Sequence, residues 1–333
     1  MTYSIFAIDA IALSPSGCSA YTYTLDSFLT YSRAPYLQFS EQAVDDVALN
    51  GGTNPAFPFL TGHGGAHQIV PFGFLGLRTD QSVLYINPDL PPQIPHVRVR
   101  TIYYAGATFS ASLNTTHTML TRWATTYPGM VDQYANTTIP LSVGPSRPQS
   151  TSYNLAINQT ITIPNRMAWK NNTYTGNLFQ CLPVKTLDAY APGQFAEAAI
   201  DGATATRWQP ATNNSASILV DMRTVAPQPI SGMFFDWGAR PPIKVTVYIS
   251  NTTDSTGNFS GKDFIKVIDV TPSEPYNATA SSQEVKPVVG NTTKVDVEGG
   301  PLSGKYAKLV IEGCWEEDGL GATVGEFVLI GPS

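Results

Sequence analysis

Two segments near the start of the chain are apolar on nearly every side. They cover residues 3–13 and 17–33, and the turn Ser14-Pro15-Ser16-Gly17 separates them, with a serine N-cap and a proline. We predict a helix in each, and a third from about residue 65 to 77. Helices without a polar face belong inside a larger assembly, so we expect these to be the end of a truncated helical domain. The alternative is a small cap on the β domain that follows.

From Leu84 onward the pattern changes to the alternation of apolar and polar residues that is typical of strands. A proline-rich link at 87–95 follows the first short run. Strands are predicted at 96–104, 107–113, 138–143 and 154–163.

A change of composition near Leu182 opens a final region with its own strand pattern. The chain is therefore predicted to be mainly β, with a helical beginning. The expected domains are residues 1–80 (helices), 81–182 (a β-sandwich) and 183–333 (a second β-sandwich).

Charge limits the possible partners. The chain of 333 residues has a formal net charge of −6, and only 13% of its residues are charged. No basic face is expected for nucleic acid or an anionic membrane, and no apolar run approaches the roughly 20 residues that cross a bilayer. A neutral partner rich in hydroxyl groups suits this composition better.

Nine Asn-x-Ser/Thr sequons are present, more than the 17 asparagines would give by chance. The excess predicts a secreted, cell-wall or vacuolar glycoprotein; the alternative is an accident of a Thr-rich β protein. Residues 3–13 imitate a signal peptide, but no Lys or Arg precedes Arg33 and Asp9 interrupts the run. We therefore expect the chain to begin inside a longer protein. The sequons start at Asn114, Asn136, Asn158, Asn171, Asn213, Asn251, Asn258, Asn277 and Asn291.

A candidate sugar site surrounds Glu41. This carboxylate lies beside the aromatic Tyr36 and Phe39, and the cluster Gly62 to His67 follows it with two histidines, His63 and His67. Aromatic faces cover the apolar side of a pyranose, imidazoles bind its hydroxyls, and a carboxylate can take a proton from an attacking water. The alternative is that Glu41 is a surface group or a helix cap.

Several long segments resemble the acid trehalases of glycoside hydrolase family 65. They read MTYSIFAI, LSPSGCSAYTY, FSEQAVDD, GGTNPAFPFLTGHGGAHQ and LYINPDLPPQIP. The resemblance implies the end of an (α/α)6 barrel followed by a β-sandwich, inverting hydrolysis of trehalose or another α-glucoside, and Glu41 as the general base. The general acid lies earlier in that family's barrel, so we expect this chain alone to be inactive.

Residues 199–208, Ala-Ile-Asp-Gly-Ala-Thr-Ala-Thr-Arg-Trp, resemble the signature of factor V/VIII type C (discoidin) domains. This implies a jelly-roll β-sandwich that binds neutral glycans. It also implies a structural Ca²⁺ held by Asp201, Thr206 and Glu326, although Ala203 stands where a second carboxylate is common. No other cofactor is expected.

Tryptophans of the last domain divide into two kinds. The resemblance places Trp208 and Trp237 in the core. Trp315, beside Glu316, Glu317 and Asp318, is the candidate platform for a sugar ring, and its alternative role is packing.

Three cysteines are consistent with one disulfide and one free thiol. Domains that resemble the last one often tie their ends together, which implies the pair Cys181 and Cys314. Cys18 would then be a free, unreactive thiol in a buried helix.

Three functions remain open at this stage: a trehalase portion, a glycan-binding glycoprotein without catalysis, and a non-functional gene fragment. The sequence upstream of Met1 would separate the first from the others.

Overall fold

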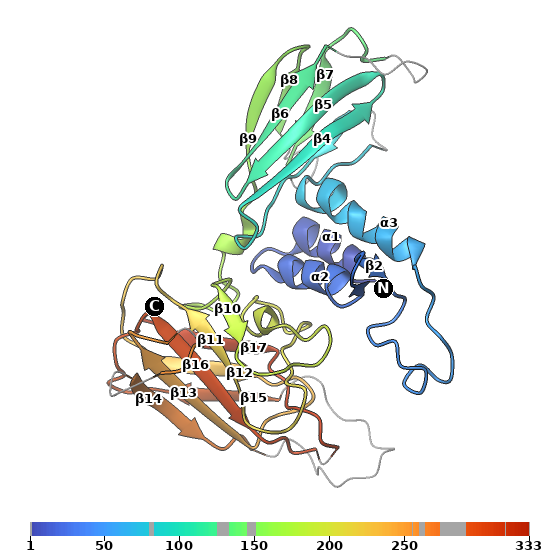
Figure 1. Cartoon of the computed structure of the whole chain (residues 1–333). Helices are drawn as coiled ribbons and strands as arrows, with labels where there is room; N and C mark the ends of the chain where they lie inside the picture. The colour runs from blue at the N-terminus through green and yellow to red at the C-terminus, as the bar shows by residue number, and fades with distance from the viewer. Residues whose placement is uncertain are drawn as a thin grey trace. The chain divides into compact units, whose positions relative to one another are not determined.

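The fold is known from a computed structural model, which describes residues 2–79, 83–124, 133–144, 151–254, 256–259, 264–273, 291–316 and 318–332. Strands dominate the described chain, as predicted. The chain forms two compact units (Figure 1). The first comprises Met1–Pro15 and Tyr23–Lys170, and the second comprises Ser16–Thr22 and Asn171–Ser333.

The three predicted helices are present, with two changes of bounds. The second, predicted over residues 17–33, ends at Phe28, and Ser32–Arg33 form a strand instead. Helix α1 spans Tyr3–Leu13 and α2 spans Ser19–Phe28. Helix α3 begins earlier than predicted, at Leu60–Gln68, and continues as a wider π-helical turn η1 at Ile69–Phe74. The turn contains Pro71, which has no N–H to continue an α-helical ladder. None of the described helices is long and apolar enough to span a membrane.

Much apolar surface of this helical part is open to solvent. Among the described residues, eleven of the twenty-one exposed large apolar side chains lie between Ile5 and Leu60. Burial of apolar surface stabilises a fold by ~25 cal/mol per Å², and surface that stays in contact with water does not contribute this stabilisation. Four of the eleven lie in α1 and α3, and the other seven lie in the turns and loop between the helices.

A short hairpin connects the helices. Strand β1, Ser32–Arg33, pairs antiparallel with β2, Gln38–Phe39. The chain then runs through a long loop to α3, and this loop contains Glu41.

The first β-sandwich follows the helices. One sheet has the order β3-β7-β8 and the other β4-β5-β6-β9. The buried Arg122 of β6 joins them, because its guanidinium donates to the carbonyl of Leu155 in β8 at 2.9 Å. The strands are β3 Leu84–Ile86, β4 His96–Tyr104, β5 Ala107–Asn114, β6 His117–Trp123, β7 Ile139–Val143, β8 Thr151–Leu155 and β9 Thr160–Pro164, and the 3-10 turn η2, Ala168–Lys170, ends the unit.

Two features of this sandwich differ from the prediction. The single strand expected at 154–163 is two strands, since Asn158 has a φ of 58° and lies in the turn between them. Strand β6 was missed because two of its inward residues are polar: Thr118 and Arg122 are both buried. Polar inward positions hide the alternation that identifies a strand.

The second unit is a β-sandwich of a five-stranded and a three-stranded sheet (Figure 1). Their orders are β10-β11-β16-β13-β14 and β15-β12-β17. Trp208 and Trp237 are fully buried in its core, as expected. The elements are β10 Val184–Thr186, the 3-10 turn η3 Ala196–Ala199, β11 Ala216–Asp221, β12 Gly232–Asp236, β13 Lys244–Ser250, β14 Phe264–Val270, β15 Thr292–Asp296, β16 Tyr306–Glu312 and β17 Glu326–Ile330.

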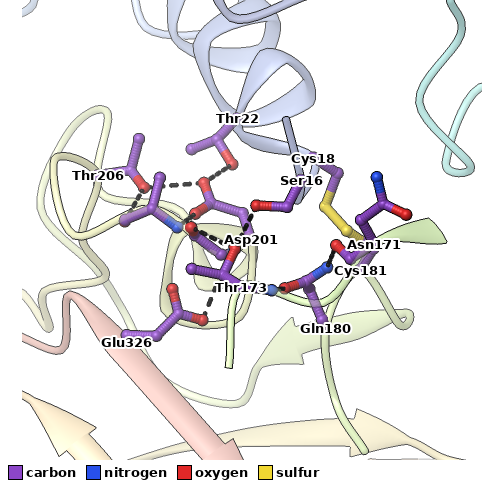
Figure 2. The surroundings of a disulfide bond; sticks show 12 residues. Ser16, Cys18, Thr22, Asn171, Thr173, Gln180, Cys181, Asp201, Thr206 and Glu326 are labelled. Carbon is purple, nitrogen blue, oxygen red and sulfur yellow. Dashed lines mark hydrogen bonds between the residues drawn. A yellow bond between two sulfur atoms is a disulfide. The ribbon is translucent and has the colours of Figure 1, made fainter. Parts of the chain in front are cut away.

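The disulfide is not the one expected. Cys181 is bonded to Cys18, with their Cα atoms 5.9 Å apart, and Cys314 is a free, buried thiol (Figure 2). The segment Ser16–Thr22 lies in the second unit, where the Cys18 N–H donates to the Asp201 carbonyl at 2.8 Å. Cys314 instead packs in the apolar core of the sandwich. A pairing across 163 residues is set by tertiary contacts, which the spacing of cysteines does not reveal.

Candidate functional site

An ion pair organises the loop that carries Glu41. Arg33 of β1 donates to both carboxylate oxygens of Asp45, at 2.6 and 3.2 Å, and Ser40 donates its hydroxyl to the same carboxylate at 2.6 Å. These hydrogen bonds, first from Arg33 and then from Ser40, lower the pKa of Asp45. Arg33 also donates to the carbonyl of Gln42 at 2.7 Å. The chain on both sides of Glu41 is thereby fixed to the hairpin.

Glu41 itself is held by a reciprocal pair of hydrogen bonds. Its backbone N–H donates to the Ala56 carbonyl at 3.0 Å, and the Ala56 N–H donates to the Glu41 Oε2 at 3.0 Å. The side chain remains exposed to solvent. A carboxylate that is oriented at one oxygen and reachable by water can act as a base.

His63 is tied to the strand that leads to Glu41. Its Nε2 accepts the Phe39 N–H at 3.0 Å, and its ring stacks on the Phe39 ring with the centroids 4.4 Å apart. Because Nε2 is an acceptor, the neutral ring carries its proton on Nδ1, where it can donate to a hydroxyl.

The other two predicted sugar contacts are less constrained. Tyr36 lies in the turn of the β1–β2 hairpin and is 83% exposed. His67 lies one turn after His63 on α3 and is also exposed. Of the three, His63 is the one that a hydrogen bond places beside the Glu41 segment within the described chain.

Sequence reasoning did not single out Arg33 and Asp45. A signal was present, since Arg33 is the first cation in the chain and Asp45 follows Glu41 by four residues. Their pairing across twelve positions became visible only in the folded hairpin.

In the second unit, Asp201 accepts hydrogen bonds from residues that are far apart in the sequence (Figure 2). Its Oδ2 accepts the hydroxyls of Thr22 at 2.6 Å and Thr206 at 2.8 Å, and its Oδ1 accepts the Ala203 N–H at 2.9 Å. Glu326 lies nearby and accepts the Gly202 N–H at 3.3 Å. The sequence predicted Asp201, Thr206 and Glu326 as neighbours, and missed Thr22.

Both carboxyl groups are buried away from water. Burial raises the pKa of Asp201 to about 7, and hydrogen bonds from Thr22 and Thr206 counteract part of that rise. Burial, and then the charge of Asp201, raise the pKa of Glu326 well above its usual value.

The Oε2 atom of Glu326 is buried and has no hydrogen-bond partner in the structure. An orphaned carboxylate oxygen beside Asp201 and the Thr206 hydroxyl has the hard oxygen chemistry that Ca²⁺ accepts. A proton on Glu326 would instead neutralise the charge of this buried carboxylate. Within the described residues, no three His, Cys, Asp or Glu side chains are grouped as metal ligands, so a cation here would rely on neutral oxygens.

Trp315 is half-buried, and its Nε1 is buried without a hydrogen-bond partner. Arg240 engages the acidic groups around it, donating to Glu316 at 2.7 Å and to Asp318 at 2.9 Å. Glu317 lies outside the described residues. The acceptors expected for sugar hydroxyls are therefore already bound to an arginine.

No protein-family model matches the chain. Similar sequences were found among characterised fungal proteins. The acid trehalase of Emericella nidulans is 42% identical over 352 aligned positions, covering 100% of this chain and 33% of the relative. The chain is similar to the C-terminal part of the fungal acid trehalases. It spans about a third of the length of the relatives that it matches.

Two further acid trehalases extend the comparison. The cell wall acid trehalase of Arthroderma benhamiae is 40% identical, covering 99% of this chain and 34% of the relative. The cell wall acid trehalase of Candida albicans is 29% identical, covering 81% of this chain and 24% of the relative.

Solved structures with a weak similarity to about half of the chain were also found. A chitosan-binding module from Paenibacillus sp. IK-5 has a TM-score of 0.35 and 17% identity, covering 47% of this chain and 100% of that chain. A Clostridium perfringens module, CpGH89CBM32-6, has a TM-score of 0.31 and 16% identity, covering 49% of this chain and 100% of that chain.

Proposed function

We propose that this chain is the C-terminal portion of an inverting acid trehalase of glycoside hydrolase family 65, in which Glu41 is the general base. Glu41 carries the proposal: its carboxylate is exposed, oriented by Ala56, and lies in a chain 42% identical to an acid trehalase. The Arg33–Asp45 pair fixes the surrounding loop.

In this mechanism, Glu41 takes a proton from a water that attacks the anomeric carbon, while an acid on the opposite side protonates the glycosidic oxygen. Inverting enzymes place the two carboxyl groups about 6.5–9.5 Å apart. His63, Tyr36 and His67 are proposed to contact the sugar. Trehalose, yielding two glucose molecules, is the proposed substrate, and another α-glucoside is the alternative.

The general acid is proposed to come from the part of the relatives that this chain does not span. Helices of that part would also cover the apolar side chains between Ile5 and Leu60 and complete an (α/α)6 barrel. A single carboxylate in an open site lacks both acid catalysis and exclusion of water. The chain alone is therefore expected not to hydrolyse trehalose.

Trehalose turnover tests this function. The purified 333-residue chain should release no glucose, whereas the same chain joined to the preceding part of an acid trehalase should do so. There, Glu41→Gln should lower kcat by a factor of about 10² or more, the typical contribution of a general base. Asp46→Asn, in the same exposed loop, is the matched control. Loss of less than tenfold in Glu41→Gln would remove Glu41 from this role.

The chain is proposed to act outside the cytoplasm, in the cell wall or another part of the secretory route. Two of the relatives described above are named cell wall enzymes. Several sequon asparagines are exposed in the structure, among them Asn114, Asn136 and Asn158. Fractionation of the source cells tests this location.

The second candidate function is binding of neutral glycans by the second unit, as a discoidin-like module, with Trp315 as the platform. Its half-buried indole supports this role, although Arg240 holds the neighbouring acids. An affinity gel with neutral polysaccharides should retain the chain weakly, because shallow sites bury little ligand surface.

Two comparisons make the gel experiment decisive. Trp315→Ala should lose retention with an unchanged Tm, and Trp315→Phe should keep most of it. Repeating the gel in Ca²⁺ and in a chelator tests a structural ion at Asp201, Thr206 and Glu326; we expect equal retention. No retention on any neutral glycan would make the module a spacer.

A further inference from the structure

An aromatic groove lies on the outer face of the five-stranded sheet. Tyr248 of β13 and Phe264 of β14 meet edge to face, with ring centroids 5.5 Å apart. Phe259 adds a third ring, 6.2 Å from Phe264. The groove has a volume of about 280 Å³, and Asn258, Lys308 and Val310 complete its lining.

Strand register places these side chains on the face opposite the core. Tyr248 pairs with Lys308 across the sheet, whereas the neighbouring Val247 and Leu309 point into the core. Side chains alternate between the two faces of a strand, so Tyr248 and Lys308 point outward. The groove therefore lies on the surface of the sandwich and is not a packing defect of its core.

Gly257 and Asn258, from the connection between β13 and β14, approach the same face. Gly257 has a φ of 90°, and a Cβ there would collide with the side chains of Leu187 and Lys185. This close approach brings the following residue, Asn258, to the rim of the groove. Phe264 nevertheless remains 39% exposed. Aromatic side chains gathered in one groove, unlike single exposed ones, are typical of a surface that contacts a partner.

The chemistry of the lining selects a neutral, partly apolar partner. Among the lining residues are three aromatic rings and a valine, with the Tyr248 hydroxyl and the Lys308 ammonium group as hydrogen-bond donors. The faces of a pyranose ring carry C–H groups that stack on aromatic rings, and its edges carry hydroxyl and acetamido groups. An N-acetylglucosamine ring meets both requirements.

Such a sugar has an attachment point at the groove itself. Asn258 opens the sequon Asn258-Phe259-Ser260, and its side chain is exposed. The Asn258 amide donates to the Thr256 hydroxyl at 2.9 Å, a contact that glycosylation would replace. The sequon asparagine Asn291, by comparison, is only 7% exposed. A tethered sugar reaches the groove at an effective concentration on the order of millimolar, which weakly bound free sugars rarely match.

We propose that an N-linked glycan on Asn258 occupies this groove, with its first N-acetylglucosamine packed on Phe264 and Tyr248. The glycan then covers the outer face of β13 and β14 and stabilises the second unit. This assignment is independent of the trehalase proposal, because it concerns the surface of the sandwich and no catalytic residue.

The test uses the full chain produced in a glycosylating eukaryotic host. Peptide mass spectrometry should find Asn258 occupied. Ser260→Ala, which removes the sequon and keeps Asn258, should lower Tm by roughly 2–4 °C and increase deuterium uptake in β14. Ser215→Ala, which removes the sequon at Asn213 on a different loop, is the matched control and should not change uptake in β14.

Two further measurements separate glycan contact from other effects of the substitution. Trimming the folded protein to a single N-acetylglucosamine should preserve Tm, because the innermost sugar makes the contact. The losses in Tm from Ser260→Ala and Phe264→Ala should be smaller together than their sum, since both remove one contact. In a bacterial host, where no glycan is added, Ser260→Ala should match the unmodified sequence.

Three results would overturn the proposal. They are an unoccupied Asn258, strictly additive losses in the double variant, and equal deuterium uptake in β14 with and without the glycan. Binding of a free neutral oligosaccharide at Phe264 that is unaffected by the Asn258 glycan would assign the groove to an external sugar instead.

Discussion

At the scale of single residues, the proposed base depends on partners that are not catalytic. Asp45 accepts hydrogen bonds from Arg33 and Ser40. Glu41 follows Ser40 in the same loop and accepts a hydrogen bond from the Ala56 N–H. Surface ion pairs contribute little to stability in general, but a bidentate arginine pair can fix geometry. The pair is therefore expected to order the loop more than to stabilise the fold.

Replacement of Asp45 by Asn should release this loop. The neutral amide loses the charge-assisted hydrogen bonds from Arg33, so the segment between Glu41 and Ala56 should be cleaved several-fold faster by a protease at low concentration. Asp46→Asn is the control, since the one described hydrogen bond of the Asp46 side chain is from the nearby Ala48 N–H. Equal cleavage of the two variants would show that the Arg33–Asp45 pair does not order the loop.

At the scale of elements, the segment Ser16–Thr22 contains the turn before α2 and the first residues of that helix, yet it belongs to the second unit. Gly17 has a φ of 75°, and a Cβ there would collide with the Asp201 carbonyl. Thr22 then donates its hydroxyl to Asp201 within the first turns of α2. The sandwich expected from residues 183–333 is therefore completed by residues from the start of the chain.

Loss of the Cys18–Cys181 disulfide should weaken the second unit. The closed loop spans a separation of 163 residues, for which the chain-entropy estimate is about 5 kcal/mol. Cys18→Ser/Cys181→Ser, or mild reduction, should lower the denaturation midpoint, measured by calorimetry. Cys314→Ala, at the free buried thiol, should change it far less, and this variant should still lose stability on reduction because it keeps the disulfide. A midpoint unaffected by reduction would contradict the pairing.

At the scale of the whole molecule, buried acids make stability depend on pH. Burial raises the pKa of Asp26 in the first unit and of Asp201 in the second to about 7, and also raises that of Glu326. A raised pKa means that the folded state binds protons that the unfolded state has already released. This contribution to stability is full below about pH 4, the usual pKa of these groups, and is lost as the pH rises toward 7.

Thermal unfolding should therefore occur at a higher temperature near pH 4.5 than near pH 7.5. The expected difference is several degrees and can be followed by circular dichroism across this range. Asp26→Asn removes one of the titrating groups and should reduce the slope of Tm against pH. A Tm that rises steadily from pH 4.5 to 7.5 would show that these carboxyl groups are ionised in the folded protein.

The sequence alone determined the features that depend on local pattern. Helix α1 has the predicted bounds, and β4 spans the predicted residues 96–104. The two core tryptophans and the loop that carries Glu41 were also identified from the order of residues. These features follow from periodicity, turn residues and long matching segments, which are readable along the chain.

Only the tertiary structure decided which distant residues meet. It paired Cys18 with Cys181, placed Thr22 on Asp201, and joined Arg33 to Asp45 around the loop of Glu41. It also assembled the aromatic groove from three strands and a connecting loop. Each of these contacts joins positions that no local period relates. They form because burial of the core fixes the register of the strands, and that register then brings the remaining side chains together.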